Sequence, residues 1–216
     1  HELKEKLHGL SADLLFLQEV QGMHHRHAGR YHDWPGKPQH EFIADTMWRE
    51  VAYGRNAVYR NGHHGNALLS RFPMLSHENE DISAHAFETR GILHCEIKIS
   101  ERAPALHCLN VHLGLFERGR QWQIQALVDR IRDTAPRDAP MIIAGAFNDG
   151  GRKADRALTD ALGVVEVFEE FKGRPARTFP SVLPMFRLDR IYARATSAGY
   201  DIVYDTLGGA FTVDAF

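Results

Sequence analysis

The stretch MIIAGAF at residues 141–147 follows Pro140 and leads into the polar pair Asn148 and Asp149. A short apolar run that begins after a proline predicts a buried strand. Upstream, apolar residues recur at helical spacing, at Ile124, Leu127, Val128 and Ile131. The sequence therefore predicts a helix that feeds a core strand, with polar groups where the strand ends.

The N-terminal part of the chain repeats this order of elements. Leu3, Leu7 and Leu10 share one helical face, and the run Ala12–Val20 then reads as a buried strand that ends in Gln18 and Glu19. Residues 21–40 are rich in His, Gly and Pro without periodicity, which is typical of a surface loop.

The remaining patterns predict further helices and strands. We expect helices around Ala44, Met47, Trp48 and Val51 and over Arg152–Leu162, a turn at NGHHG (61–65), and strands at Asn56–Tyr59, Asn66–Ser70, Gly91–Ile99, Ala105–His112, Val164–Phe168, Leu188–Ala193 and Asp201–Tyr204. Helices, strands and paired strands in both halves predict two sheets packed face to face with helices outside, in one α/β domain over residues 1–216.

Composition limits the classes of function. The 216 residues carry 26 Lys and Arg against 28 Asp and Glu, and this near-zero charge argues against a dedicated binder of duplex DNA. No apolar run approaches the roughly 20 residues that span a bilayer, so we expect a soluble, monomeric, cytoplasmic protein with no integral membrane association. Cys95 and Cys108 are expected as buried free thiols, although paired strands could place them opposite each other.

Polar groups follow four of the predicted strands: Glu19, His112, the pair Asn148 and Asp149, and Asp189. Strand ends are where α/β folds build sites. Glu19 is a candidate ligand of Mg²⁺, which prefers oxygen ligands, with Mn²⁺ as an alternative. His112 is a candidate general acid or phosphate contact, because imidazole titrates near neutral pH.

Each of these residues also has a structural interpretation. Glu19 could be a solvated strand end, His112 a structural histidine, and Asp189 the partner of an arginine. Zinc is not expected, because the loop histidines His24, His25, His27, His32 and His40 lack a recognised ligand spacing. Arg177 and Arg187 flank the GRPARTFPS segment with Arg174 and Arg190, and could bind the phosphate of a substrate.

Taken together, LQEV, GNALLSRFP, LNVHLG, GAFND and RTFPSVLPMFRLDRIY occur in the order seen in the endonuclease/exonuclease/phosphatase family, the DNase I-like phosphodiesterases. The chain resembles the YbhP-like bacterial branch through EFIADTMW, YGRNAVY, GHHGNALLSR and GRPARTFP. The resemblance implies a four-layer αββα sandwich with a metal site at one end of the two sheets.

The resemblance also implies roles for individual residues. Glu19 is expected to bind Mg²⁺, Asn110 and His112 to bind phosphate and transfer a proton, Asn148 to donate to phosphoryl oxygens, and Asp189 to orient a later histidine. Asn66, in GNALLSR, joins Arg177 and Arg187 as an expected substrate-binding residue.

The sequence departs from the family pattern at three places. The family motif Gly-Asp-Phe-Asn is replaced by Gly145, Ala146, Phe147 and Asn148, so a methyl group stands where the carboxylate would position or deprotonate water. Asp149 is not expected to replace it, because adjacent strand residues face opposite sides. The closing Ser-Asp-His is absent from GGAFTVDAF, which supplies only Asp214, and the expected sheet lacks the inner strand that precedes the first helix.

The sequence therefore leads to three hypotheses. The first is a Mg²⁺-dependent hydrolase of phosphate esters, with activity weak or absent in this chain, that acts on a phosphorylated small molecule or a phospholipid headgroup. The second is a Mg²⁺-dependent nuclease that acts on nucleic acid. The third is a pseudoenzyme that binds a phosphorylated ligand through Glu19, His112 and Asn148 without turnover.

Overall fold

The computed structural model describes residues 2–24, 37–60, 62–179, 183, 185–194, 200–204 and 211–215. Sheet A is antiparallel and has the order β1-β3-β2, with β1 over Leu14–His24, β2 over Glu50–Tyr59 and β3 over Gly62–Ser70. Sheet B has the order β4-β5-β6-β7-β9-β8, with bounds Met74–Asp81, Gly91–Ile97, Leu106–His112, Met141–Ala146, Asp189–Arg194 and Val165–Glu166.

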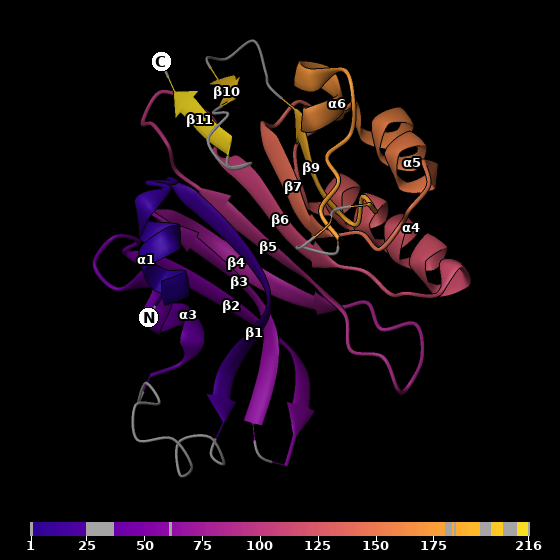
Figure 1. Cartoon of the computed structure of the whole chain (residues 1–216). Helices are drawn as coiled ribbons and strands as arrows, with labels where there is room; N and C mark the ends of the chain where they lie inside the picture. Colours follow the sequence, from indigo (N-terminus) through magenta and orange to yellow (C-terminus); the bar gives the residue numbers. More distant parts are fainter. Residues whose placement is uncertain are drawn as a thin grey trace.

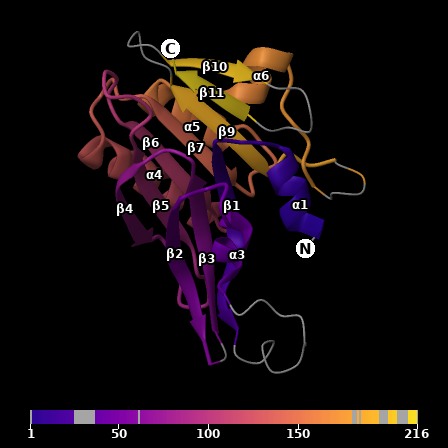
Figure 2. The ribbon, with the colours of Figure 1, turned by 90° about the vertical axis from the view of Figure 1, so that its left-hand side faces the viewer.

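The helices cover the outer faces of the two sheets (Figures 1 and 2). Helices α1 (Glu2–Gly9) and α3 (Gln39–Ala44) lie against sheet A, while α4 (Glu117–Thr134) and α5 (Lys153–Leu162) lie against sheet B. Helix α4 connects β6 to β7, which are the parallel pair of sheet B. The chain therefore forms the expected four-layer αββα sandwich.

Strand β3 shows how the sequence builds these layers. Leu68 belongs to the core between the sheets, together with Leu93 and Ile142 of sheet B. The next residue, Leu69, points to the other side and packs with Trp48 beneath the helices. Both leucines have no exposed surface, and this alternation is the two-residue period of a strand whose two faces are covered.

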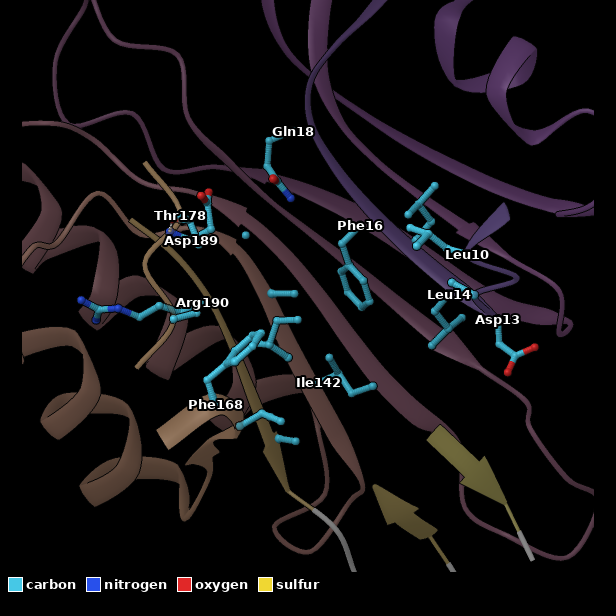
Figure 3. A pocket seen from close by; sticks show the side chains of 18 of the residues that line it. Leu10, Asp13, Leu14, Phe16, Gln18, Ile142, Phe168, Thr178, Asp189 and Arg190 are labelled. Carbon is cyan, nitrogen blue, oxygen red and sulfur yellow. Dashed lines mark hydrogen bonds between the residues drawn. The ribbon is translucent and has the colours of Figure 1, made fainter. Parts of the chain in front are cut away.

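Within the described residues, β1 pairs with β3 on one side and has no partner strand on the other. A cavity of about 510 Å³ lies beside this edge, between β1 and strands β7 and β9 of sheet B. Figure 3 shows Leu14, Phe16 and Ile142 on its walls. This edge of β1 is therefore one wall of the cavity.

Two expected elements were wrong. The helix expected through Val51 ends at Ala44, because the backbone turns at Asp45, where φ is 45°, and Val51 belongs to β2. Trp48 still packs in the core, and its indole Nε1 donates to the Ala12 carbonyl at 2.9 Å. The strand expected over 164–168 is reduced to two residues, since the Glu166 side chain accepts from the Glu169 N–H and starts helix α6 (Val167–Lys172).

Other differences lie in the β regions. The stretch expected as an NGHHG turn contributes residues 62–65 to β3 instead. Strand β4 was not expected, because its side chains are mostly exposed and polar. The hairpin of β10 (Tyr200–Tyr204) and β11 (Phe211–Ala215) extends the single strand expected at Asp201–Tyr204.

Cys95 and Cys108 face each other across β5 and β6 as buried free thiols, as expected. Burial raises the pKa of Cys95 to about 12, which keeps this thiol protonated. No helix in the described part of the chain is long and apolar enough to cross a membrane.

Candidate functional site

The candidate site begins at a bulge in β1. The register of β1 against β3 shifts between Leu17 and Val20, and Glu19 adopts a left-handed backbone with φ of 55°. Gln18 donates from Nε2 to Oδ1 of Asn110 at 2.6 Å, while Glu19 contacts His112. The bulge thus turns two adjacent side chains toward β6, although successive residues of a regular strand face opposite sides.

Three basic side chains surround the Glu19 carboxylate. Its oxygens lie 2.9 Å from His112 Nδ1, 3.2 Å from His64 Nε2 and 3.8 Å from Arg90 Nη1. The hydrogen bond from His112 is the main cause that lowers the pKa of Glu19, and the charges of His112, His64 and Arg90 add to it against the opposing effect of burial. The Glu19 side chain is 51% exposed, so the site holds an ionised carboxylate that is open to solvent.

Asn110 joins the two sheets at this end of the sandwich. Its side chain has no exposed surface, and Nδ2 donates to the carbonyl oxygens of Leu17 and Ala67 at 2.9 and 2.8 Å. Asn66, also buried, donates to the carbonyls of Gly91 and Asn110, while its Oδ1 has no hydrogen-bond partner among the residues that the structure describes. In this structure both amides bind the backbone of neighbouring strands, which fixes the position of the site.

Strand β7 brings Ala146 and Asn148 to the same end. Ala146 lies opposite His112 on β6 and opposite Asp189 on β9, so its methyl group occupies the middle of the site. Asn148 has a left-handed backbone with φ of 51° and donates from Nδ2 to the Leu113 carbonyl at 2.7 Å. Left-handed backbones at Glu19 and Asn148 place two of the strained non-glycine residues of the described chain at one site.

Asp149 and Arg187 belong to a buried ionic network behind the site. Asp149 accepts from the backbone N–H groups of Ala154 and Gly151 and pairs with Arg190. Burial favours the neutral acid, but these hydrogen bonds and the Arg190 charge together lower the pKa of Asp149. Asp149 therefore does not take the place of a carboxylate at Ala146.

Asp155 is the centre of the same network. It accepts from Arg187, from Arg190 at 2.9 Å and from the Tyr192 hydroxyl at 2.6 Å. The guanidinium of Arg187 is thus engaged with Asp155, whereas the sequence predicted that it binds the substrate.

Asp189 is exposed and begins β9. Its backbone N–H donates to Oγ1 of Thr178 at 3.1 Å, and no ion pair to its carboxylate occurs among the described residues. The salt bridges of this segment are made by Arg190 instead. Figure 3 shows Gln18, Thr178 and Asp189 together at one end of the cavity, and Arg177 also lines it.

The structure brings most of the expected residues to one end of the sandwich. Glu19 contacts His112 directly, Asn110 lies beside them through Gln18, and Asp189 lies across β7. His64 and Arg90 were not among the residues expected at the site. The available signals were a second histidine in GHHGN and an arginine directly before the strand at Gly91.

The donor atoms of the site suit a magnesium ion that is bound by a single protein carboxylate. Mg²⁺ commonly binds one or two carboxylates and completes its shell with water and substrate phosphate. Glu19, ionised and half exposed, fits as the single carboxylate. Within the described residues, no group of three or more His, Cys, Asp or Glu side chains is placed to hold a metal ion. The expected loop histidines His25, His27 and His32 lie outside the described residues.

Two packed sheets with polar groups at one mouth define the class of DNase I-like α/β sandwich proteins. The family model "Endonuclease/Exonuclease/phosphatase family" matches residues 1–207, and the chain belongs to this family. It is 46% identical over 197 residues to the uncharacterized protein YbhP of Escherichia coli strain K12, an alignment that covers 91% of this chain and 78% of YbhP.

Solved structures share the fold at low sequence identity. The endonuclease/exonuclease/phosphatase from Beutenbergia cavernae superposes with a TM-score of 0.68 at 14% identity; the match covers 98% of this chain but spans 64% of that one. The mannosyl-6-phosphatase Bt3783 of Bacteroides thetaiotaomicron gives a TM-score of 0.66 at 13% identity, with coverage of 98% and 85%. The family thus includes proteins described as phosphatases and as nucleases.

Proposed function

We propose that this chain is a Mg²⁺-dependent hydrolase of phosphate esters whose turnover is weak or absent. The observation that carries the proposal is the pair of Glu19 and His112 beside Ala146. An ionised carboxylate and an imidazole lie in contact, and a methyl group occupies the neighbouring position on β7. Binding groups are therefore present where a base for the attacking water is lacking.

Each side chain has a part in this proposal. Glu19 would hold the metal, and the metal would supply Lewis-acid polarisation of the phosphoryl group. His112, held at Nδ1 by Glu19, would orient the ester and exchange a proton with it, and Arg90 would attract its negative charge. Asn148 would need to give up its hydrogen bond to Leu113 before it donates to a phosphoryl oxygen.

The substrate is proposed to be a phosphorylated small molecule or a phospholipid headgroup. The net charge of −2 supports this class over duplex DNA, which calls for a basic surface. The description of Bt3783 as a mannosyl-6-phosphatase supports phosphate monoesters as one candidate within the class.

The test is Ala146→Asp, assayed with bis(4-nitrophenyl) phosphate and Mg²⁺. A carboxylate at this position is expected to raise hydrolysis by about 10²-fold or more, since general-base catalysis contributes that much. The double variant Glu19→Gln/Ala146→Asp is the matched control and is expected to return to background. If Ala146→Asp remains at the level of the unaltered chain, the proposed chemistry is wrong.

A non-catalytic role is the second candidate, and the engagement of Asp149 with Arg190 favours it, because this neighbouring acid is not free to replace the missing one. Calorimetry with Mg²⁺ and a phosphate ester separates the two. Ligand binding without turnover, both in the unaltered chain and in Ala146→Asp, supports the pseudoenzyme. Nicking of plasmid DNA by Ala146→Asp would instead support the nuclease.

A further inference from the structure

Three apolar side chains project into solvent from two neighbouring loops at the site end of sheet B. Phe87 is 98% exposed, Phe116 71% and Leu115 68%. We refer to Phe87, Leu115 and Phe116 as the apolar rim. Single exposed apolar residues are ordinary, but several on adjacent loops mark an interaction surface.

The two loops lie side by side and are held together. A side chain added at Gly119, in the first turn of α4, would reach within 2.9 Å of the Ala84 Cβ atom. Across the same junction, the rings of His85 and Phe116 lie 6.4 Å apart. Figure 1 shows the loop that follows β4 and the beginning of α4 on the same side of the molecule.

Buried hydrogen bonds fix the loops from below. Gln123, with no exposed surface, accepts from the Gly114 N–H at 2.7 Å and donates to the Ile82 carbonyl at 3.0 Å and to Glu88 at 2.8 Å. Glu88 in turn accepts from the Ala84 N–H at 3.0 Å. The two loops that carry the apolar rim are therefore held in place before binding. This preorganisation reduces the conformational entropy that is lost when the rim binds a partner.

The rim is continuous with the candidate site. Leu115 follows His112 by three residues, and the carbonyl of Leu113 between them accepts from Arg90 Nε at 3.2 Å and from Asn148 at 2.7 Å. Whatever binds the rim thus lies at the entrance to the Glu19 and His112 pair.

The charges around the rim also limit what can bind. Arg118 is exposed, and Arg120 donates to the Gly114 and Leu115 carbonyls. The nearby acids are engaged, Glu88 in the hydrogen bonds above and Glu117 with Lys153. Exposed aromatic and aliphatic tips with arginine beside them are typical of segments that enter the headgroup region of a bilayer.

We propose that the apolar rim docks this protein on a phospholipid bilayer, so that the site faces lipid headgroups. The inference rests on the proposed function for the class of substrate, but the surface can be tested alone. Three projecting side chains are far fewer than the roughly 20 to 30 residues that each partner contributes to a stable protein interface. Insertion of a few aromatic side chains is enough for reversible membrane association.

The test is co-sedimentation of the full chain with vesicles of phosphatidylcholine, alone or mixed with phosphatidylglycerol. The unaltered protein is expected to bind, more tightly with the anionic lipid because of the arginines. Phe87→Ser/Phe116→Ser is expected to lower partitioning by about tenfold or more, since each aromatic side chain loses its apolar transfer energy. Both residues are exposed, so the variant should keep its fold.

Leu75→Ser is the matched control, because Leu75 is 56% exposed on β4 at the end away from the site. It should bind vesicles as the unaltered chain does. The proposal is overturned if the unaltered chain binds neither vesicle, if Phe87→Ser/Phe116→Ser binds equally well, or if the rim variant instead loses affinity for a single-stranded oligonucleotide.

A second assay separates this inference from the proposed function. In the Ala146→Asp background, the rim variant should hydrolyse a water-soluble diester at an unchanged rate. Vesicle binding without hydrolysis would contradict the proposed function alone, and hydrolysis without vesicle binding would contradict the membrane surface alone.

Discussion

Glu19 and His112 come from different sheets, yet Oε1 of the glutamate lies 2.9 Å from Nδ1 of the histidine. The contact depends on the bulge that places Glu19 in a left-handed backbone. This contact joins the two sheets at the mouth of the sandwich, so the geometry of the site and the packing of the sheets depend on each other.

Glu19→Gln should separate metal binding from ester binding. The amide keeps the size of the side chain but loses the charge, so Mg²⁺ binding is expected to weaken by about tenfold or more. Calorimetric titration with MgCl₂ measures this directly. Glu78→Gln, an exposed carboxylate paired with Arg130, is the control and should leave Mg²⁺ binding unchanged. Equal Mg²⁺ affinity in Glu19→Gln and the unaltered chain would exclude Glu19 as the ligand.

Asn110→Ala should destabilise the fold. The substitution removes three hydrogen bonds, leaves the carbonyls of Leu17 and Ala67 and the Gln18 amide without that partner, and opens a small cavity between the sheets. We expect the free energy of unfolding to fall by about 2 to 4 kcal/mol in urea denaturation. Asn79→Ala removes one exposed hydrogen bond to Asn56 and should cost less than about 0.5 kcal/mol. A similar loss in both variants would argue against a joining role for Asn110.

The layers of the fold could be predicted because their residues follow regular periods. The apolar run at Met141–Ala146 and the helical stripe of α4 each bury a continuous face, and periodicity reports such burial. Strand β4 was missed because its exposed residues, such as Ser76 and Glu78, carry no period-two apolar signal. The helix expected through Val51 failed because an apolar spacing of three and four does not reveal the turn at Asp45.

The sequence predicted which residues form the candidate site better than it predicted the contacts between them. Glu19 and His112 each follow an apolar run, so their placement at strand ends could be expected from the sequence. The contacts of His64 and Arg90 with Glu19 depend on the β1 bulge and on the pairing of β1 with β3, which are long-range properties. Arg187 was assigned to substrate because a local sequence cannot show that Asp155 lies beside it.

Gly145→Ala should be among the most damaging single substitutions at the site. The residue has φ of 144°, and an added Cβ atom would lie 1.9 Å from the Val111 carbonyl oxygen on β6. The strands must then separate or the backbone must change, so we expect a loss of more than about 3 kcal/mol in the free energy of unfolding. Gly150→Ala, with open space around the added Cβ atom, is the control. Thermal unfolding that is equally affected by both would contradict this account of the close approach of β6 and β7.

The buried pair of His94 and His107 should make stability depend on pH. Their rings are joined by a hydrogen bond of 2.9 Å between Nε2 and Nδ1. Burial, with the charge of His107, lowers the pKa of His94 to about 4, and burial also lowers the pKa of His107. An unfolded histidine has a pKa near 6.5, so between about pH 6.5 and 4 the unfolded chain binds more protons than the folded one.

The sign of the effect follows from this difference in bound protons. Stability is fully present above about pH 6.5 and falls as the pH drops toward 4, by an amount on the order of 3 kcal/mol for His94. His94→Gln removes one of the titrating groups and should flatten the decline, at the cost of a lower plateau at pH 7.5. His77→Gln, an exposed site on β4, should keep the slope of the unaltered chain. Urea denaturation at several pH values measures the slopes, and an unchanged slope in His94→Gln would show that the acid sensitivity arises elsewhere.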